Sequence, residues 1–538
     1  MLPILALGTG FAIVSILLAV AWRVSNYFRD PKGLRRFTNM SYFSGITNLP
    51  FIVVAHRFQR SEYVLTRHQE TGKGVLRIGP NHLSYSDPQA IRYIYGHGTK
   101  CAKDEGYEIQ KGTHYHLADV VDKSDHARKR KILASAYAIK NLEEWEYKVA
   151  DKVERLIQQF DKRCTAPLPS GQRIPAAEDV NVNYRMWTNL FTVEAIADIG
   201  LSIKLGFLDR GDDMCQAVSL AGTTFEAPFR ESLYTNNEKT SLLVHSYKWF
   251  KTLDKLSSYT WGIYRRGTEA AKAWDGIHLA LTQKRLEMYR RGEKHEDFFQ
   301  ALMEDKSGRP NDLELGEIDA EINIMLNAGS TTTAIAIANV MFHLLKHPDV
   351  LAKLREEIDR AMDPDEVIAS YENVKNLPYL KACLDESLRI YSPTTQNLGR
   401  VTPPEGMLIL DDFIPGGVSV SMSALVVHQD ATIFPEPRKY IPERWLGEGG
   451  KRLQPFFLAF SAGARGCIGR NISYLEQTVL LASLLHRYEF ALPTPNFEVT
   501  RQETMNYHVG PLPLKIWRRD IPGSELSEKT QTQSLGHL

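Results

Sequence analysis

The segment from about Leu313 to Lys346 constrains the fold of this chain more than any other. It reads as one long helix, and its centre, Ala334-Ile-Ala-Ile-Ala338, is apolar on all sides. A helix whose whole circumference is apolar crosses the core of a protein, because any side turned to water would expose hydrophobic surface. We therefore expect a large, mainly helical domain built around this segment.

The rest of the chain indicates one large domain with minor β structure. No Gly/Ser-rich linker, repeat or low-complexity tract interrupts residues 40–520 of this 538-residue chain. Helical patterns dominate from about 125 to 350. Short strands are predicted around Gly79-Pro80, before a helix capped at Ser86 or Asp87, and within residues 400–422. The predicted fold class is mainly α with small β-sheets, and residues 520–538 read as a polar tail.

Residues 1–22 predict a transmembrane signal-anchor. Leu2 to Trp22 contains no charged residue and as a helix would span about 30 Å, the thickness of a bilayer core. Residues 23–39 form a basic juncture, which by the positive-inside rule leaves the downstream chain in the cytosol. A cleaved signal peptide and a buried soluble helix are the alternatives. The length of the run and the charges after it favour the anchor.

A cysteine in a glycine-rich loop is the clearest chemical signal. Phe460-Ser-Ala-Gly-Ala-Arg465-Gly-Cys467-Ile-Gly469 leads into a helical pattern from Arg470 to Tyr488. A cysteine at a helix N-terminus is favoured as thiolate, and the glycines allow close approach of a flat partner. Arg465 could neutralise an anionic group on that partner. The plainer alternative is a buried structural cysteine.

This run resembles the haem-binding signature of the cytochrome P-450 family, and the resemblance extends over residues 40–519. It implies the P-450 fold and a haem b whose iron is ligated by Cys467. It also implies that Phe460, Arg465 and Gly469 contact the cofactor. His126 and Arg130, four residues apart on a predicted helix, match the family's propionate-binding positions.

A second family motif lies within the long helix. Ala328-Gly-Ser-Thr-Thr-Thr333 resembles the family's oxygen-binding groove, where Gly329 would open space and the Thr332 hydroxyl would hold dioxygen or water. Thr331 stands where the family has an acid associated with proton delivery. A water chain at Thr331 could replace that carboxylate. The alternative is ordinary helix packing, with the threonines bonded to the preceding turn.

Two further segments are predicted to be scaffold. Glu386 and Arg389 lie three residues apart in an apolar context, which implies burial and full pairing. With Arg444 they resemble the family's structural triad behind the haem. His428 is predicted to be structural, and His114-Tyr-His116 to be a polar loop rather than a metal pair.

The net charge and the cysteine pattern limit the kinds of partner and the cell compartment that we expect for this chain. The net charge of +1 gives no nucleic-acid footprint, and the five cysteines, at 101, 164, 215, 383 and 467, include no C-x-x-C. The scattered cysteines fit a reducing compartment. The family resemblance implies NADPH–cytochrome P-450 reductase as electron donor, with cytochrome b5 as an additional candidate. Arg128, Lys129 and Lys131 form a candidate docking surface for an acidic flavoprotein.

These features predict a haem-thiolate monooxygenase of the endoplasmic reticulum membrane, with its catalytic domain cytosolic. It would insert one atom of O2 into a hydrophobic substrate, by hydroxylation or epoxidation, in fungal secondary or aromatic metabolism. A haem-thiolate isomerase or dehydratase without need for NADPH and O2 is the first alternative, and a non-catalytic haem protein the second. The predicted pocket segments are the 101–121 loop, residues 225–233, the neighbourhood of Ala328, and residues 394–398 and 505–508.

Overall fold

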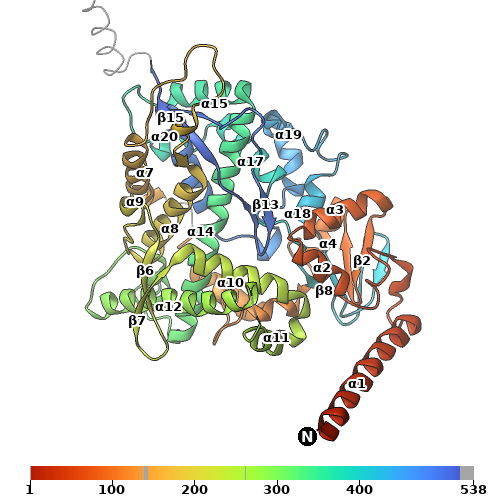
Figure 1. The fold of residues 1–538 in the computed structure, drawn as a ribbon. Coiled ribbons are helices and arrows are strands. Elements are labelled where there is room, and N and C mark those ends of the chain that lie inside the picture. The colour runs from red at the N-terminus through yellow and green to blue at the C-terminus, as the bar shows by residue number, and fades with distance from the viewer. Residues whose placement is uncertain (1, 135, 138–142, 261, 522–538) are drawn as a thin grey trace, which may run out of the picture.

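The fold is mainly helical with small sheets, as predicted (Figure 1). The structure, a computed structural model, describes residues 2–134, 136–137, 143–260 and 262–521, and side chains from residue 14 onward except residue 16. Most of the predicted polar tail therefore lies outside the described residues. The longer helices are α1 (Leu2–Arg29), α2 (Leu49–His56), α3 (Arg60–Thr71), α5 (Lys123–Ala134), α7 (Glu146–Asp161), α8 (Tyr184–Leu201), α10 (Phe229–Leu243), α11 (Phe250–Ser257), α12 (Ile263–Arg290), α14 (Leu315–Lys346), α15 (Pro348–Ala361), α17 (Pro378–Ile390) and α20 (Arg470–Arg487). The short ones are α4 (Ile91–Ile94), α9 (Phe207–Arg210), α13 (Phe298–Met303), α16 (Tyr371–Val374), α18 (Ala424–His428) and α19 (Gly447–Leu453).

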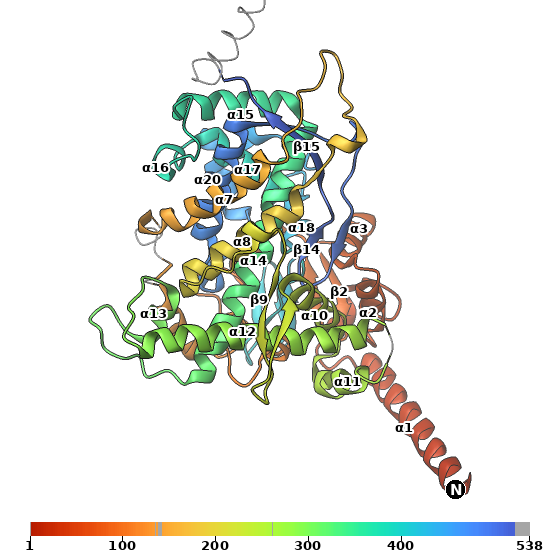
Figure 2. The ribbon, with the colours of Figure 1, turned by 60° about the vertical axis from the view of Figure 1, so that its left-hand side comes forward.

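The helix α14 is the centre of the molecule. It packs against α8, α12, α17 and α20, and Figures 1 and 2 show it in the middle of the helical part. Its apolar centre, from Ala334 to Ala338, is buried from all sides, as the sequence requires. Within the described residues, α14 is the helix long and apolar enough to cross a bilayer, but 78% of its most apolar stretch is buried inside the protein. It is therefore a core helix.

The strands form small sheets beside the helical part. The largest has six strands in the order β1-β2-β3-β11-β8-β4, with β11 parallel to β3 and antiparallel to β8. Its strands are β1 (Thr38–Asn39), β2 (Val75–Gly79), β3 (His82–Tyr85), β4 (Ala102–Lys103), β8 (Arg400–Val401) and β11 (Ser419–Ser421). The other strands are β5 (Val182–Asn183), β6 (Met214–Val218), β7 (Thr224–Pro228), β9 (Met407–Ile409), β10 (Asp412–Ile414), β12 (Tyr488–Ala491), β13 (Arg501–Glu503), β14 (Tyr507–Val509) and β15 (Pro513–Arg518).

The predicted strands around residue 80 and within 400–422 are confirmed. The hairpin β2–β3 turns at Gly79 to His82, and Asp87 accepts a hydrogen bond from the Gln89 backbone N–H at the start of the next helical turn. Asp87, rather than Ser86, is thus the capping residue.

Helical structure dominates residues 125–350, as predicted, but a hairpin that the sequence did not indicate interrupts it. The antiparallel hairpin β6–β7 lies between α9 and α10 and packs on α12. Most side chains of the two strands are in contact with solvent. Ala217 and Ala227 are the buried positions of the hairpin. Such a hairpin leaves little apolar periodicity in the sequence, which explains why it was missed.

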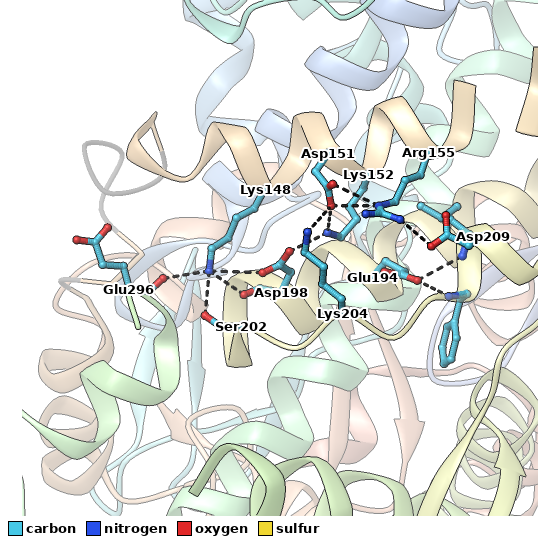
Figure 3. Close-up of polar contacts among 12 residues, drawn as sticks. Lys148, Asp151, Lys152, Arg155, Glu194, Asp198, Ser202, Lys204, Asp209 and Glu296 are labelled. Carbon is cyan, nitrogen blue, oxygen red and sulfur yellow. Dashed lines mark hydrogen bonds and ion pairs between the residues drawn. The ribbon is translucent and has the colours of Figure 1, made fainter. Parts of the chain in front are cut away.

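Buried charges join α7 to α8 (Figure 3). Lys152 is fully buried, and its Nζ lies 2.7 Å from Asp198 Oδ2 and 2.5 Å from Asp151 Oδ2. Lys148 Nζ donates to the Asp198 and Glu296 carbonyl oxygens. Buried charges are tolerated when paired in this way, so the cluster fixes the position of α7 beside α8.

The helix α1 projects from the body of the molecule (Figure 1). It continues beyond the predicted limit at residue 22 as far as Arg29. Its described apolar side chains, such as Leu17, Leu18 and Trp22, are exposed. The side chains of residues 1–13 and 16 lie outside the described part, so the anchor stays a prediction.

Candidate functional site

The Cys467 loop is closed tightly on itself before α20. The Cys467 N–H donates to the Phe460 carbonyl oxygen at 2.9 Å, and the Gly466 N–H donates to the Gly463 carbonyl oxygen at 3.0 Å. Gly463 has φ of 66°, and a Cβ there would lie 1.9 Å from the Tyr95 carbonyl oxygen. Only glycine therefore fits at 463, and this turn presents Cys467 two residues before the helix cap at Gly469.

Cys467 faces a cavity of about 380 Å³. Its side chain is reachable from this cavity although it lies deep below the protein surface. Burial raises the pKa of the thiol, while the Gly469 N–H, Arg470 and Arg130 lower it. The helix terminus was expected to favour the thiolate by itself. Desolvation outweighs it here, so the pKa of the Cys467 thiol lies above its usual value.

Basic side chains gather in the lining of this cavity. His126 and Arg130 of α5 and Arg465 of the cysteine loop all line it, so the structure brings these three predicted residues together. Arg465 donates to the carbonyl oxygens of Val120 and Val121 at 2.6 and 3.0 Å, and Arg130 donates to that of Gly466 at 2.7 Å.

Two more cations of this group were missed from the sequence. Lys103 lines the cavity, and it lies directly opposite Arg400 where β4 pairs with β8. Both are buried, and like charges directly opposite in a sheet are unfavourable. No sequence signal indicates the pair, because β4 and β8 are two residues long and join segments about 300 residues apart.

Lys103, Arg130, Arg400 and Arg465 form a cluster of positive charges that would be stabilised by a bound anion. Burial, followed by the charges of Arg400 and Arg465, lowers the pKa of Lys103, and burial with Arg400 lowers that of Arg465 to about 10. Burial and the same cations lower the pKa of His126 to about 4. Among the described residues, Lys103, Arg130, Arg400 and Arg465 form no ion pair with a carboxylate. Since buried charges need counterions, the site fits a ligand that carries carboxylates.

The helix α14 forms a further part of the cavity wall. Ala328, Gly329 and Thr332 line the cavity, and the Thr332 hydroxyl donates to the Ala328 carbonyl oxygen at 2.8 Å. A threonine bonded to the preceding turn in this way is what ordinary helix packing, the alternative interpretation of this motif, predicts. Thr331 is fully buried outside the cavity lining, and its hydroxyl has no hydrogen-bond partner within the described part of the chain.

Gly329 serves helix packing as well as the cavity. A Cβ on Gly329 would lie 2.5 Å from Ile196 Cγ1 of α8. The expectation that this glycine opens space for a ligand is therefore incomplete. Its missing side chain lets α8 approach α14 closely, and Ile196 itself also lines the cavity.

The predicted scaffold residues pair as expected. Arg389 Nε and Nη2 donate to the two Glu386 carboxylate oxygens at 2.8 and 2.9 Å, and Arg444 Nε donates to Glu386 Oε1 at 3.0 Å. Glu386 and Arg389 are fully buried. His428 is buried too, and its Nε2 accepts from the Leu458 N–H at 2.9 Å, which ties it to the chain leading to the cysteine loop.

The predicted basic docking surface is wrong at Lys129. Lys129 is only 3% exposed and pairs with Glu317 and with Glu321 Oε1, the latter at 3.2 Å. Arg128 is exposed but pairs with Glu317 and Asp125. Lys131 is the exposed cation that remains of the three.

The histidines at 114 and 116 have separate partners. His114 Nε2 lies 2.8 Å from Glu314 Oε2, whereas His116 is buried beside Asp119. No group of three or more metal-ligating side chains occurs among the described residues.

The predicted pocket segments are only partly right. Lys103, Leu117, Ala118, Thr394 and Gln396 line the cavity, but residues 225–233 and 505–508 do not. Residue 225 belongs to the solvated β6–β7 hairpin, and Phe229 and Leu233 are buried in the hydrophobic core instead. Several apolar wall residues were missed because nothing but tertiary structure brings them there, namely Tyr137, Phe298, Phe299, Leu302 and Ile472.

A second, larger cavity of about 1370 Å³ lies between α1, α2 and the 244–249 turn. Gln396 and Leu398 line both cavities. These two residues therefore mark the boundary through which the first cavity adjoins the second.

Comparison with known proteins agrees with this site. The cytochrome P-450 family model matches residues 47–516. A benzoate 4-monooxygenase of Aspergillus niger is 27% identical over 89% of this chain and 92% of its own length. The cytochrome P-450 monooxygenase cicH of Emericella nidulans is 30% identical over 84% and 88%. The cytochrome P-450 monooxygenase atr2 of Stereocaulon alpinum is 30% identical over 80% of each chain. The chain therefore belongs to the cytochrome P-450 family of monooxygenases.

Proposed function

We propose that this chain binds haem b through Cys467 and inserts one atom of O2 into a hydrophobic organic substrate, by hydroxylation or epoxidation. One observation carries the proposal. The Cys467 sulfur faces a cavity whose lining also holds basic side chains without a carboxylate partner among the described residues, together with Ala328 and Thr332 of α14. A flat group with a metal centre and two carboxylates fits those three features.

The residues of the chain then have distinct tasks. Cys467 would hold the iron, while His126, Arg130 and Arg465, with the added Lys103, would hold the carboxylates. The haem supplies the oxygen chemistry when bound. Phe460 and Gly469 line the cavity beside the sulfur and would exclude water from it.

On the wall formed by α14, Gly329 and Thr332 would border the space above the sulfur. Thr332 would exchange its present bond to Ala328 for one to a bound water or substrate oxygen. Thr331 would act behind them through a water molecule, because a buried hydroxyl without a partner is unfavourable.

The substrate class follows from the walls. The side chains of Ile196, Phe298, Ile322 and Met325 make most of the lining apolar, with Thr394 and Gln396 among the polar groups. This supports a mostly hydrophobic ligand that carries some oxygen atoms. The fungal relatives, a benzoate 4-monooxygenase among them, support a role in fungal secondary or aromatic metabolism.

We further propose attachment to the endoplasmic reticulum membrane by α1, with the catalytic domain cytosolic. Exposed apolar side chains near the base of α1 support a membrane-facing surface, namely Phe43, Leu49, Val53, Trp249, Leu256 and Tyr259. Electrons would come from NADPH through the membrane-bound cytochrome P-450 reductase, with cytochrome b5 as a second donor. Lys131, with the half-neutralised Arg128, would contribute to the reductase contact.

The test is the substitution Cys467→Ala, with the purified full chain. The wild type should bind haem and give the thiolate-type band when reduced and exposed to CO, and the variant should lose both that band and turnover. An unchanged band in the variant would refute the assignment of Cys467. Product formation by the wild type that needs neither NADPH nor O2 would instead point to the isomerase or dehydratase alternative.

A further inference from the structure

A buried carboxylate outside the predicted site lines the same cavity. Glu321 lies on α14, seven residues before Ala328 and eleven before Thr332, so about two and three helical turns separate it from them on one face. It is 5% exposed. A buried acid on the wall of an apolar cavity is unfavourable unless its oxygens are fully used.

Both oxygens of Glu321 have partners. Oε2 accepts the backbone N–H of Leu117 at 3.1 Å, and Oε1 accepts Lys129 Nζ at 3.2 Å. Burial raises the pKa of Glu321, whereas Lys129 and the Leu117 N–H lower it. Lys129 of α5 therefore stabilises the negative charge of the Glu321 carboxylate. The other carboxylate oxygen accepts a hydrogen bond from one backbone N–H, that of Leu117.

That loop, residues 116–122, is held by charged side chains from three directions. Glu321 holds Leu117 from α14, and Lys103 donates to the Ala118 carbonyl oxygen from β4. From the cysteine loop, Arg465 donates to the carbonyl oxygens of Val120, Val121 and Asp122. The segment thus runs as a strap from the Cys467 side of the cavity to α14.

The strap places side chains in the cavity wall. Leu117 and Ala118 both line it, while the backbone of the strap makes the contacts just described. Among the described residues of α14, Glu321 is the one that accepts a hydrogen bond from the backbone N–H of Leu117. Removal of that acceptor would leave a buried N–H without a partner, which costs about 1–3 kcal/mol and favours local opening.

We propose that Glu321 is a positioning residue that holds the 116–122 strap through the Leu117 N–H, and so determines how closely Leu117 approaches a ligand bound over Cys467. The effect on ligands rests on the proposed haem function, but the effect on the strap does not.

Hydrogen exchange of the full chain tests the strap. Glu321→Ala removes the acceptor, whereas Glu321→Gln keeps an amide oxygen for the Leu117 N–H. Glu317→Gln is the matched control, because Glu317 is one turn away on α14 and pairs with Lys129 and Arg128 without contact to the strap. Glu321→Ala should raise the exchange rates of amides 117–120 at least about tenfold, and the other two variants should change them less than about threefold.

Ligand binding by the haem-loaded variants tests the consequence. Imidazole is small, and 4-phenylimidazole adds a ring that must fit under the cavity wall. The ratio of their dissociation constants, from the shift of the haem absorption band, should change at least about fivefold in Glu321→Ala and stay near wild type in Glu321→Gln and Glu317→Gln.

The outcomes separate cleanly. Wild-type exchange at 117–120 in Glu321→Ala would overturn the proposal, as would an equal increase in Glu317→Gln. A wild-type ligand ratio in a variant whose strap has opened would overturn the ligand part. If the wild type failed to bind haem, the proposed function would fail, and the exchange result would still decide whether Glu321 holds the strap.

Discussion

At the scale of single residues, burial decides what each charge does. The carboxylate of Glu386 is fully buried and accepts from Arg389, Arg444, Trp445 and the Ile441 N–H. The cations around Arg465 are buried or half-buried without a carboxylate partner in the described part of the chain, and we assign them to a ligand. The same residue types therefore act as scaffold or as binding site according to whether the protein itself supplies the counterion.

Glu386→Ala should strongly destabilise the protein, because it leaves Arg389 buried without a partner. We expect a loss of about 3–5 kcal/mol in the free energy of unfolding, measured by urea denaturation. The control is Glu448→Ala, since Glu448 lies in the same region but its pair with Lys451 is exposed. That surface pair should contribute less than about 1 kcal/mol. Equal losses in the two variants would contradict a buried triad.

At the scale of elements, the fold depends on how closely α8 and α12 approach α14. The contact with α8 requires the missing side chain of Gly329, and the contact with α12 includes an ionic group. His278 of α12 lies 3.0 Å from Asp319 of α14 and 3.6 Å from Asp275.

Gly329→Ala should destabilise the α8–α14 contact by about 1–3 kcal/mol, since the new Cβ meets Ile196. Ile196→Ala should relieve part of that clash, so the double variant should be more stable than the sum of the two single losses predicts. Urea unfolding of the four proteins measures the coupling. Strict additivity would show that the glycine is not needed for this contact.

The His278 pair should make stability fall at alkaline pH. Burial lowers the pKa of His278, but its bonds to Asp275 and Asp319 outweigh burial and raise it to about 9. Because the folded-state pKa exceeds the unfolded value of about 6.5, the contribution is complete below pH 6.5 and is lost as the pH rises through 9. The loss should reach up to about 3 kcal/mol. His278→Gln should flatten the stability profile over this range, and substitution of the exposed His97 by Gln should leave the slope in place.

At the scale of the whole molecule, α1 stands apart from the chemistry. Its residues Ala19, Val20, Arg23 and Val24 line the second cavity, which adjoins the first only at Gln396 and Leu398. The projecting helix and the apolar residues near its base thus lie on one side of the molecule, and the Cys467 cavity lies inside the helical body.

Deletion of residues 2–22 should therefore separate membrane attachment from haem binding. In sedimentation with phosphatidylcholine vesicles, the full chain should pellet and the truncated chain should remain largely in solution. The truncated chain should keep the wild-type CO band, because none of the described side chains of α1 lines the first cavity. Equal pelleting of both proteins would show that the apolar surface at Trp249 and Leu256 is sufficient for attachment.

The sequence by itself determined the central helix, the cysteine loop, the Glu386–Arg389 pair and the family, because each depends on residues that lie close together in the chain. Periodicity reveals α14, and short spacing reveals Cys467 with Arg465 and Glu386 with Arg389. Tertiary structure decided the rest. Lys103 faces Arg400 across a sheet, Glu321 reaches Leu117, and Lys129 is buried against α14 rather than free for a partner. These contacts join segments about 190 to 300 residues apart, and burial, which sets the meaning of each charge, exists only once those segments meet.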